Sequence, residues 1–80
     1  MSARVHMPGI LPGLLRSELE RAITESALSE YDTLIARRYL VEKVPQIDIA
    51  VELGWERKTI SRRTKQIALA VERTANKLYL

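Results

Sequence analysis

Pro45 and Gly54 place two helix boundaries in the C-terminal half of the chain, and they constrain its fold more than any other feature. Proline disfavours helical geometry in the residue before it but fits the first turn of a new helix. Glycine readily adopts the left-handed conformation in which many helices end. The spacing therefore predicts a short helix over residues 46–53, separated by sharp turns from one helix before it and one after it.

Apolar residues recur at spacings of three and four after Gly54, and they predict a long helix from about Arg57 to about Leu78. One face of this helix is expected to be buried: Ile60, Thr64, Ile67, Val71, Thr74 or Ala75, and Leu78. The opposite face carries Lys58, Arg62, Lys65 and Leu69. The basic residues thus form a stripe along the outside of the helix. The long seam either pairs with a second chain, as in a coiled coil, or packs against the first helix, which is the alternative we favour.

Two further helices are expected before Pro45. The first is predicted over about 14–27, with one narrow apolar stripe made of Leu15, Leu19, Ala22, Ile23 and Ser26. The second is expected to begin with Ser29 as its N-cap, with Asp32 three residues later, and to run to about Glu42. Its apolar residues do not fit one stripe, which is typical of a central helix. The expected fold is therefore all-α, with a disordered segment at 1–10 and one four-helix domain at 11–80.

Composition favours a binding protein over an enzyme. The chain has 80 residues, no cysteine and one histidine, His6, near the N-terminus. These counts exclude disulfides, thiolate zinc sites and cysteine nucleophiles, and they leave no histidine for a serine–histidine–acid triad. The sequence contains no glycine-rich phosphate loop, apolar membrane span or signal peptide. We expect a cytoplasmic, nucleoid-associated protein without catalytic activity, metal, cofactor, small-molecule substrate or membrane contact.

Positive charge is concentrated in the last third of the chain. Residues 1–54 carry six basic and eight acidic side chains, whereas residues 55–80 carry seven basic and two acidic ones. The excess is densest at Arg57, Lys58, Arg62, Arg63 and Lys65. A positive patch on a mildly acidic body indicates a polyanionic partner, although a solvated helix surface has the same composition.

Residues 45–66 have the spacing of a helix-turn-helix, with two helices joined by a tight turn. The backbones of such helices approach closely and need a small residue, here Ala50. The turn needs a residue that accepts positive φ, here Gly54, and the second helix needs an apolar anchor, here Ile60. The expected core of the motif consists of Ile49, Ala50, Leu53, Gly54, Trp55 and Ile60.

Four stretches carry a family resemblance: LSEYD from residue 28, ARRYL from residue 36, IAVELGW from residue 49 and KTISR from residue 58. They resemble the fourth region of bacterial sigma factors and the small sigma-like proteins of phages and mobile elements. The resemblance spans about residues 28–78 and implies that the last helix is a DNA recognition helix. Eighty residues leave no room for the other segments of a full sigma factor, so we expect an excised domain or a stand-alone relative.

The chain departs from this family at four positions. Glu56 stands where the family prefers serine or threonine as the recognition-helix cap. Pro45 replaces the usual hydroxyl cap of the preceding helix, and Lys43 falls where glycine is common. Arg63 occupies a position that is often aliphatic. Glu56 is also expected to be repelled by phosphate.

The predicted DNA contacts fall into two groups. Residues expected to face base edges in the major groove are Lys58, Ser61, Arg62 and Lys65, because such side chains can hydrogen-bond to bases. Residues expected to face phosphates are Gln46, Arg57, Thr59 and Arg63. One of Arg37 and Arg38 is expected to reach the DNA backbone; the alternative for Arg38 is a pair with Glu42, four residues later.

These features predict sequence-specific binding of double-stranded DNA by a small transcription regulator or an accessory factor of a phage or mobile element. One such domain contacts about five to six base pairs, so a homodimer or a partner such as RNA polymerase is implied. The alternative is a sigma-like protein-interaction module that binds RNA polymerase or another protein without reading DNA. A DNA-binding arm of a packaging or recombination complex would use the same chemistry.

Overall fold

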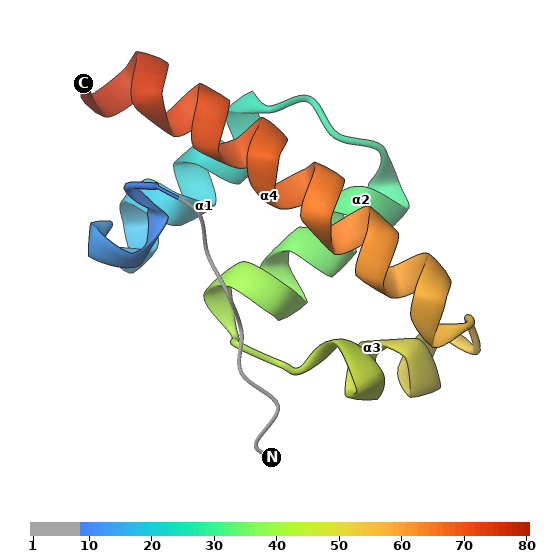
Figure 1. Ribbon diagram of the computed structural model, residues 1–80. Helices are drawn as coiled ribbons and strands as arrows, with labels where there is room; N and C mark the ends of the chain where they lie inside the picture. The colour runs from blue at the N-terminus through green and yellow to red at the C-terminus, as the bar shows by residue number, and fades with distance from the viewer. Residues whose placement is uncertain (1–8) are drawn as a thin grey trace.

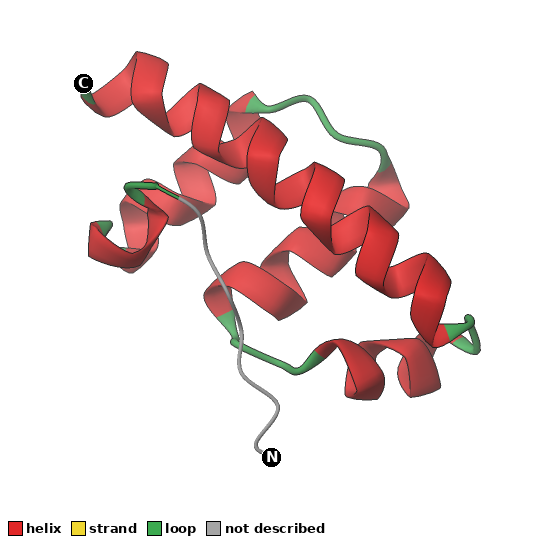
Figure 2. Cartoon of the chain, in the orientation of Figure 1, coloured by secondary structure: helices red, strands yellow, loops and turns green. Residues whose placement is uncertain are grey.

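The computed structural model describes residues 9–80, which form helices and turns and, in this range, no β-strand (Figures 1 and 2). The elements are η1 (Leu11–Gly13), α1 (Arg16–Glu25), α2 (Glu30–Ala36), η2 (Arg37–Val41), α3 (Gln46–Leu53) and α4 (Arg57–Tyr79). The element η1 is a 3-10 turn, and η2 is a π-helical turn that continues α2. The all-α fold with four helices is confirmed. Residues 1–8, most of the segment predicted to be disordered, lie outside the described residues.

Three helix ends follow the local chemistry predicted from the sequence. The Ser29 hydroxyl accepts a hydrogen bond from the backbone N–H of Asp32 (3.2 Å) and caps α2. α3 spans residues 46–53 and ends at Gly54, which has a φ of 69°. The N–H of Trp55 then donates to the carbonyl of Ala50 (3.0 Å), which closes the left-handed end of the helix.

The predicted start of the first helix is wrong. Leu14 and Leu15 are extended, with ψ of 148° and 157°, and they follow the separate turn η1 over Leu11–Gly13. α1 therefore begins at Arg16, and the Glu18 carboxylate accepts from the N–H of Leu15 (2.8 Å). Leu15 is 67% exposed and does not belong to the buried stripe. The second helix also differs from the prediction, because its α-helical part ends at Ala36 and continues as the π-helical turn η2.

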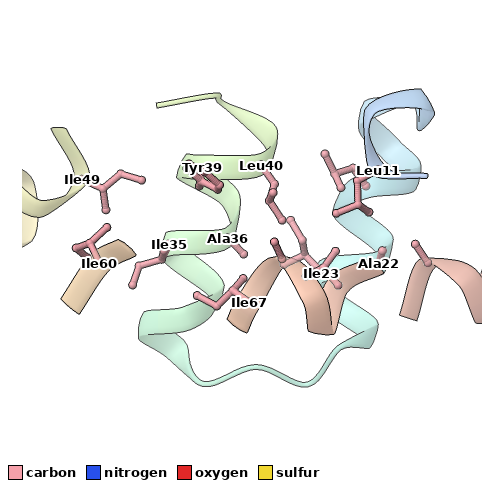
Figure 3. Packing of buried hydrophobic residues seen from close by; sticks show 14 of the residues in the cluster. Leu11, Ala22, Ile23, Ile35, Ala36, Tyr39, Leu40, Ile49, Ile60 and Ile67 are labelled. Carbon is pink, nitrogen blue, oxygen red and sulfur yellow. The ribbon is translucent and has the colours of Figure 1, made fainter. Parts of the chain in front are cut away.

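The segment α2–η2 lies at the centre of the core, as its apolar pattern predicted (Figure 3). It packs against α1, α3 and α4. The buried apolar residues of the domain are Leu11, Leu19, Ala22, Ile23, Ile35, Ala36, Tyr39, Leu40, Ile49, Ala50, Ile60, Ile67, Ala68, Val71 and Ala75.

α4 runs in front of α1 and α2 in Figure 1 and reaches from one end of the molecule to the other. Its 23 residues correspond to about 34 Å, close to the longest dimension of the molecule, 35 Å. The distal half of its apolar seam packs against α1, as favoured from the sequence. Two hydrogen bonds join these helices: Ser26 Oγ donates to Thr74 Oγ1 (2.9 Å), and the Tyr79 hydroxyl donates to the carbonyl of Glu18 (3.3 Å).

Candidate nucleic-acid interface

The corner between α3 and α4 assembles the residues predicted as the core of the motif. Ile49, Ala50 and Ile60 are buried, and the half-buried Leu53 and Trp55 pack against them. Gly54 supplies the left-handed turn. The corner thus fixes the direction in which α4 leaves α3.

Arg63, predicted to contact phosphate, is engaged within the domain. Its Nε and one terminal nitrogen lie 3.0 Å and 2.9 Å from Oδ1 of Asp32 on α2. Its guanidinium lies 5.8 Å from the ring centroid of Trp55, which itself packs against Tyr31 with ring centroids 5.3 Å apart. These contacts fasten the start of α4 to α2, which stabilises the corner.

Gln46, also predicted to contact phosphate, directs its amide inward. Nε2 donates to the hydroxyl of Thr64 (2.8 Å) and to that of Tyr39 (3.5 Å). The Thr64 hydroxyl in turn donates to the carbonyl of Ser61 (3.0 Å). Because Thr64 is buried, this network satisfies a polar group in the core and joins the first turn of α3 to the middle of α4.

The remaining predicted contacts lie on the solvent side of α4. Lys58, Ser61, Arg62 and Lys65 are all exposed, and Leu69, which is 44% exposed, continues their row. We call these five residues the basic face. Arg57 and Thr59 are exposed in the first turn of α4, beside this face.

Three of the four described arginines that precede α4, namely Arg16, Arg37 and Arg38, pair with carboxylates, whereas the cations of the basic face do not. Arg37 lies 2.9 Å from Glu20, which also pairs with Arg16 (3.3 Å). Arg38 pairs with Glu42, one of the two predicted alternatives, and also with Glu52. The hydrogen bonds that its guanidinium donates to the Glu52 carboxylate and then to the Glu42 carboxylate raise its pKa. By contrast, no carboxylate of residues 9–80 lies within 4.0 Å of the side-chain nitrogens of Lys58, Arg62 or Lys65.

Two exposed cations at the far end of α4 were missed in the sequence. Arg73 and Lys77 are exposed and likewise have no ion pair with any described carboxylate. Helical spacing contained the signal for Arg73, which follows Leu69 by four residues and therefore lies on the same side.

Two other kinds of site, a metal site and a membrane span, are absent from the part of the chain that the structure describes. There, no group of three histidine, cysteine, aspartate or glutamate side chains could hold a metal ion. No helix of residues 9–80 combines the length and apolar character needed to cross a membrane. In comparisons with known proteins, no family model, curated protein or solved structure matches this chain.

Proposed function

We propose that this chain binds double-stranded DNA through the basic face, with α3, the turn at Gly54 and α4 acting as a helix-turn-helix. The supporting observation is the separation of charge. The carboxylates Glu20, Glu42 and Glu52 engage arginines of the body, and the cations of the basic face keep their charge unpaired. Unpaired lysine and arginine side chains bind DNA by displacing its condensed counterions.

In this proposal the exposed side chains of α4 contact two parts of the DNA, the base edges and the phosphates. Lys58, Arg62 and Lys65 donate to guanine edges in the major groove, and Ser61 contacts a base or a phosphate. Arg57 and Thr59 contact phosphates beside the groove.

Gln46 and Arg63 take a different role from the one their sequence positions suggested. Because both side chains are already bonded to other helices, we assign them to positioning α4 rather than to direct phosphate contact.

The biological role that fits this chemistry is that of a small transcription regulator or an accessory factor of a phage or mobile element, similar to the fourth region of sigma factors. A site of about five to six base pairs is too short to be unique. The proposal therefore includes a second copy of the chain or RNA polymerase as a partner on DNA.

The direct test is fluorescence anisotropy with a random duplex of about 25 base pairs at several salt concentrations. With about four to six phosphate contacts, log K is expected to fall with log salt at a slope of about −4 to −5. The double variant Arg62→Gln/Lys65→Gln should lower the affinity, because it removes two contacts to base edges, and Arg57→Gln should flatten the slope by about 0.9, because it removes one phosphate contact. Arg21→Gln is the matched control, since Arg21 is exposed on α1 and has no ion pair with a described carboxylate.

A protein-interaction module is the second candidate, and the surface of α2 favours it. Tyr31 is 57% exposed beside the half-buried Trp55, and Leu34 is exposed one turn further along α2. Glu56, exposed at the start of α4, would also repel phosphate. This candidate replaces the first if the double variant binds DNA as the unmodified chain does while Leu34→Ala abolishes capture of purified RNA polymerase.

A further inference from the structure

Exposed carboxylates at the starts of α3 and α4 disfavour an approach to DNA by the N-terminal ends of these helices. Glu56 precedes the first turn of α4, is exposed, and makes no capping hydrogen bond through its side chain. Asp48 is exposed in the first turn of α3 and has no ion pair with any cation of the described residues. A phosphate brought to the start of either helix would meet a carboxylate that has no ion pair with a described cation.

With Arg73, four cations and Leu69 form a row along α4 that is much longer than an end-on contact requires. Lys58, Arg62, Lys65, Leu69 and Arg73 follow one another at steps of four, three, four and four residues. At about 100° per residue, these five positions fall within an arc of about 80° on the helix surface. They extend over about 22 Å of the helix axis, whereas the major groove is about 12 Å wide. The row is therefore long enough to reach from one phosphate backbone to the other.

Within residues 9–80, every position of this row is exposed. The buried residues of distal α4, such as Ile67, Val71 and Ala75, lie on the side that packs against the other helices. In Figure 1, α4 crosses in front of α1 and α2 over the full length of the molecule. Glu72, which precedes Arg73, is half-buried, and its carboxylate lies against Gly9.

We propose, on the basis of the DNA-binding function proposed above, that α4 docks lengthwise in the major groove and that Leu69 contacts the 5-methyl group of a thymine. In this docking Lys58, at one end of the row, contacts a phosphate in place of the guanine edge assigned to it above, and Arg73 contacts a phosphate on the opposite side of the groove. Continuous basic helices lie across the groove in this way in other DNA-binding proteins, and apolar side chains contact the thymine methyl. Leu69 lies between Lys65 and Arg73 and is 44% exposed, so this docking places its apolar surface against the bases.

The test of Leu69 removes one methyl group from the DNA. A tight duplex is first selected with the unmodified chain from a randomised library, and each thymine is then replaced in turn by uracil. At one position the unmodified chain should lose about fourfold in affinity, which corresponds to one buried methyl group. Leu69→Ala should bind the thymine and uracil forms equally. Leu34→Ala, which removes a leucine of the same 44% exposure on α2, should keep the discrimination.

The test of Arg73 uses the salt dependence of binding to the same duplex. Arg73→Gln should flatten the slope by about 0.9, as expected for one lost phosphate contact, and Arg21→Gln should leave it unchanged. All variants change exposed residues, so equal melting temperatures should verify their folding.

The outcomes separate this inference from the function on which it depends. If the unmodified chain selects no duplex and binds no random DNA at low salt, both proposals fail. If Lys58→Gln flattens the slope but Arg73→Gln does not, or if Leu69→Ala retains the preference for thymine, lengthwise docking is wrong and the DNA-binding function stands. Loss of the thymine preference together with the flatter slope of Arg73→Gln supports lengthwise docking.

Discussion

At the scale of single residues, Lys43 occupies a backbone conformation suited to glycine. Its φ is 58°, and it stands at a position where the sigma-like proteins that the chain resembles commonly carry glycine. A residue with a side chain pays about 1–2 kcal/mol in this region, and glycine loses about 0.5–1 kcal/mol in backbone entropy on folding. Lys43→Gly should therefore raise the free energy of unfolding by about 0.5–1 kcal/mol, measured in urea. A decrease would mean that the lysine side chain stabilises the turn.

Gly54, unlike Lys43, is a glycine in the left-handed conformation, with a φ of 69° at the corner between α3 and α4. No heavy atom lies within 4 Å of the position that a Cβ would take, so Gly54→Ala introduces backbone strain without a clash. The variant should lower the free energy of unfolding by about 1–2 kcal/mol. Gly54→Asn should lose less, because asparagine tolerates the left-handed conformation better. Equal losses in urea denaturation would contradict this explanation.

At the scale of helices, the two N-caps differ in a way that can be measured. Ser29 caps α2 through its hydroxyl, whereas Glu56 precedes α4 without a side-chain cap. Ser29→Ala should lower the free energy of unfolding by about 1 kcal/mol. Glu56→Ser should raise it by about 0.5 kcal/mol, since a new cap outweighs the lost attraction between the carboxylate and the helix dipole. Thermal unfolding followed by circular dichroism checks both signs, and destabilisation by Glu56→Ser would contradict the second.

The sequence predicted the helices whose ends are encoded locally and misplaced those that depend on neighbours. Pro45, Gly54 and Ser29 act on adjacent backbone, so the boundaries at these positions are correct. Leu15 was misplaced because its exposure depends on the turn η1, which has no periodic pattern.

The same distinction applies to the candidate site. Exposure of the basic face follows from helical spacing within α4 alone. The internal roles of Arg63 and Gln46 depend on Asp32 and Thr64, which are 31 and 18 residues away along the chain, and helical spacing cannot reveal such partners.

At the scale of the whole molecule, α4 and the central segment α2–η2 both connect the α3–α4 corner with α1. The first half of α4 packs against α3 and its second half against α1, while α2 contacts it between them. The side chains Ile60 and Ile23, one from each region, are buried to 0% and 1% exposure. A helix shared by both regions should make them unfold together, because neither can lose its packing without exposing part of the same seam.

This coupling predicts that a substitution near one end of α4 is sensed at the other. Trp55 is the only tryptophan in the chain and lies at the α3–α4 corner, so its fluorescence reports on that region. Ile23→Val, which changes α1, should lower the free energy of unfolding by about 0.5–1.5 kcal/mol. It should shift the urea midpoint of Trp55 fluorescence as much as that of far-ultraviolet circular dichroism. Ile60→Val serves as the local control. If Ile23→Val shifts only the circular dichroism midpoint, the corner folds independently of α1, and the basic face would keep its shape when α1 unfolds.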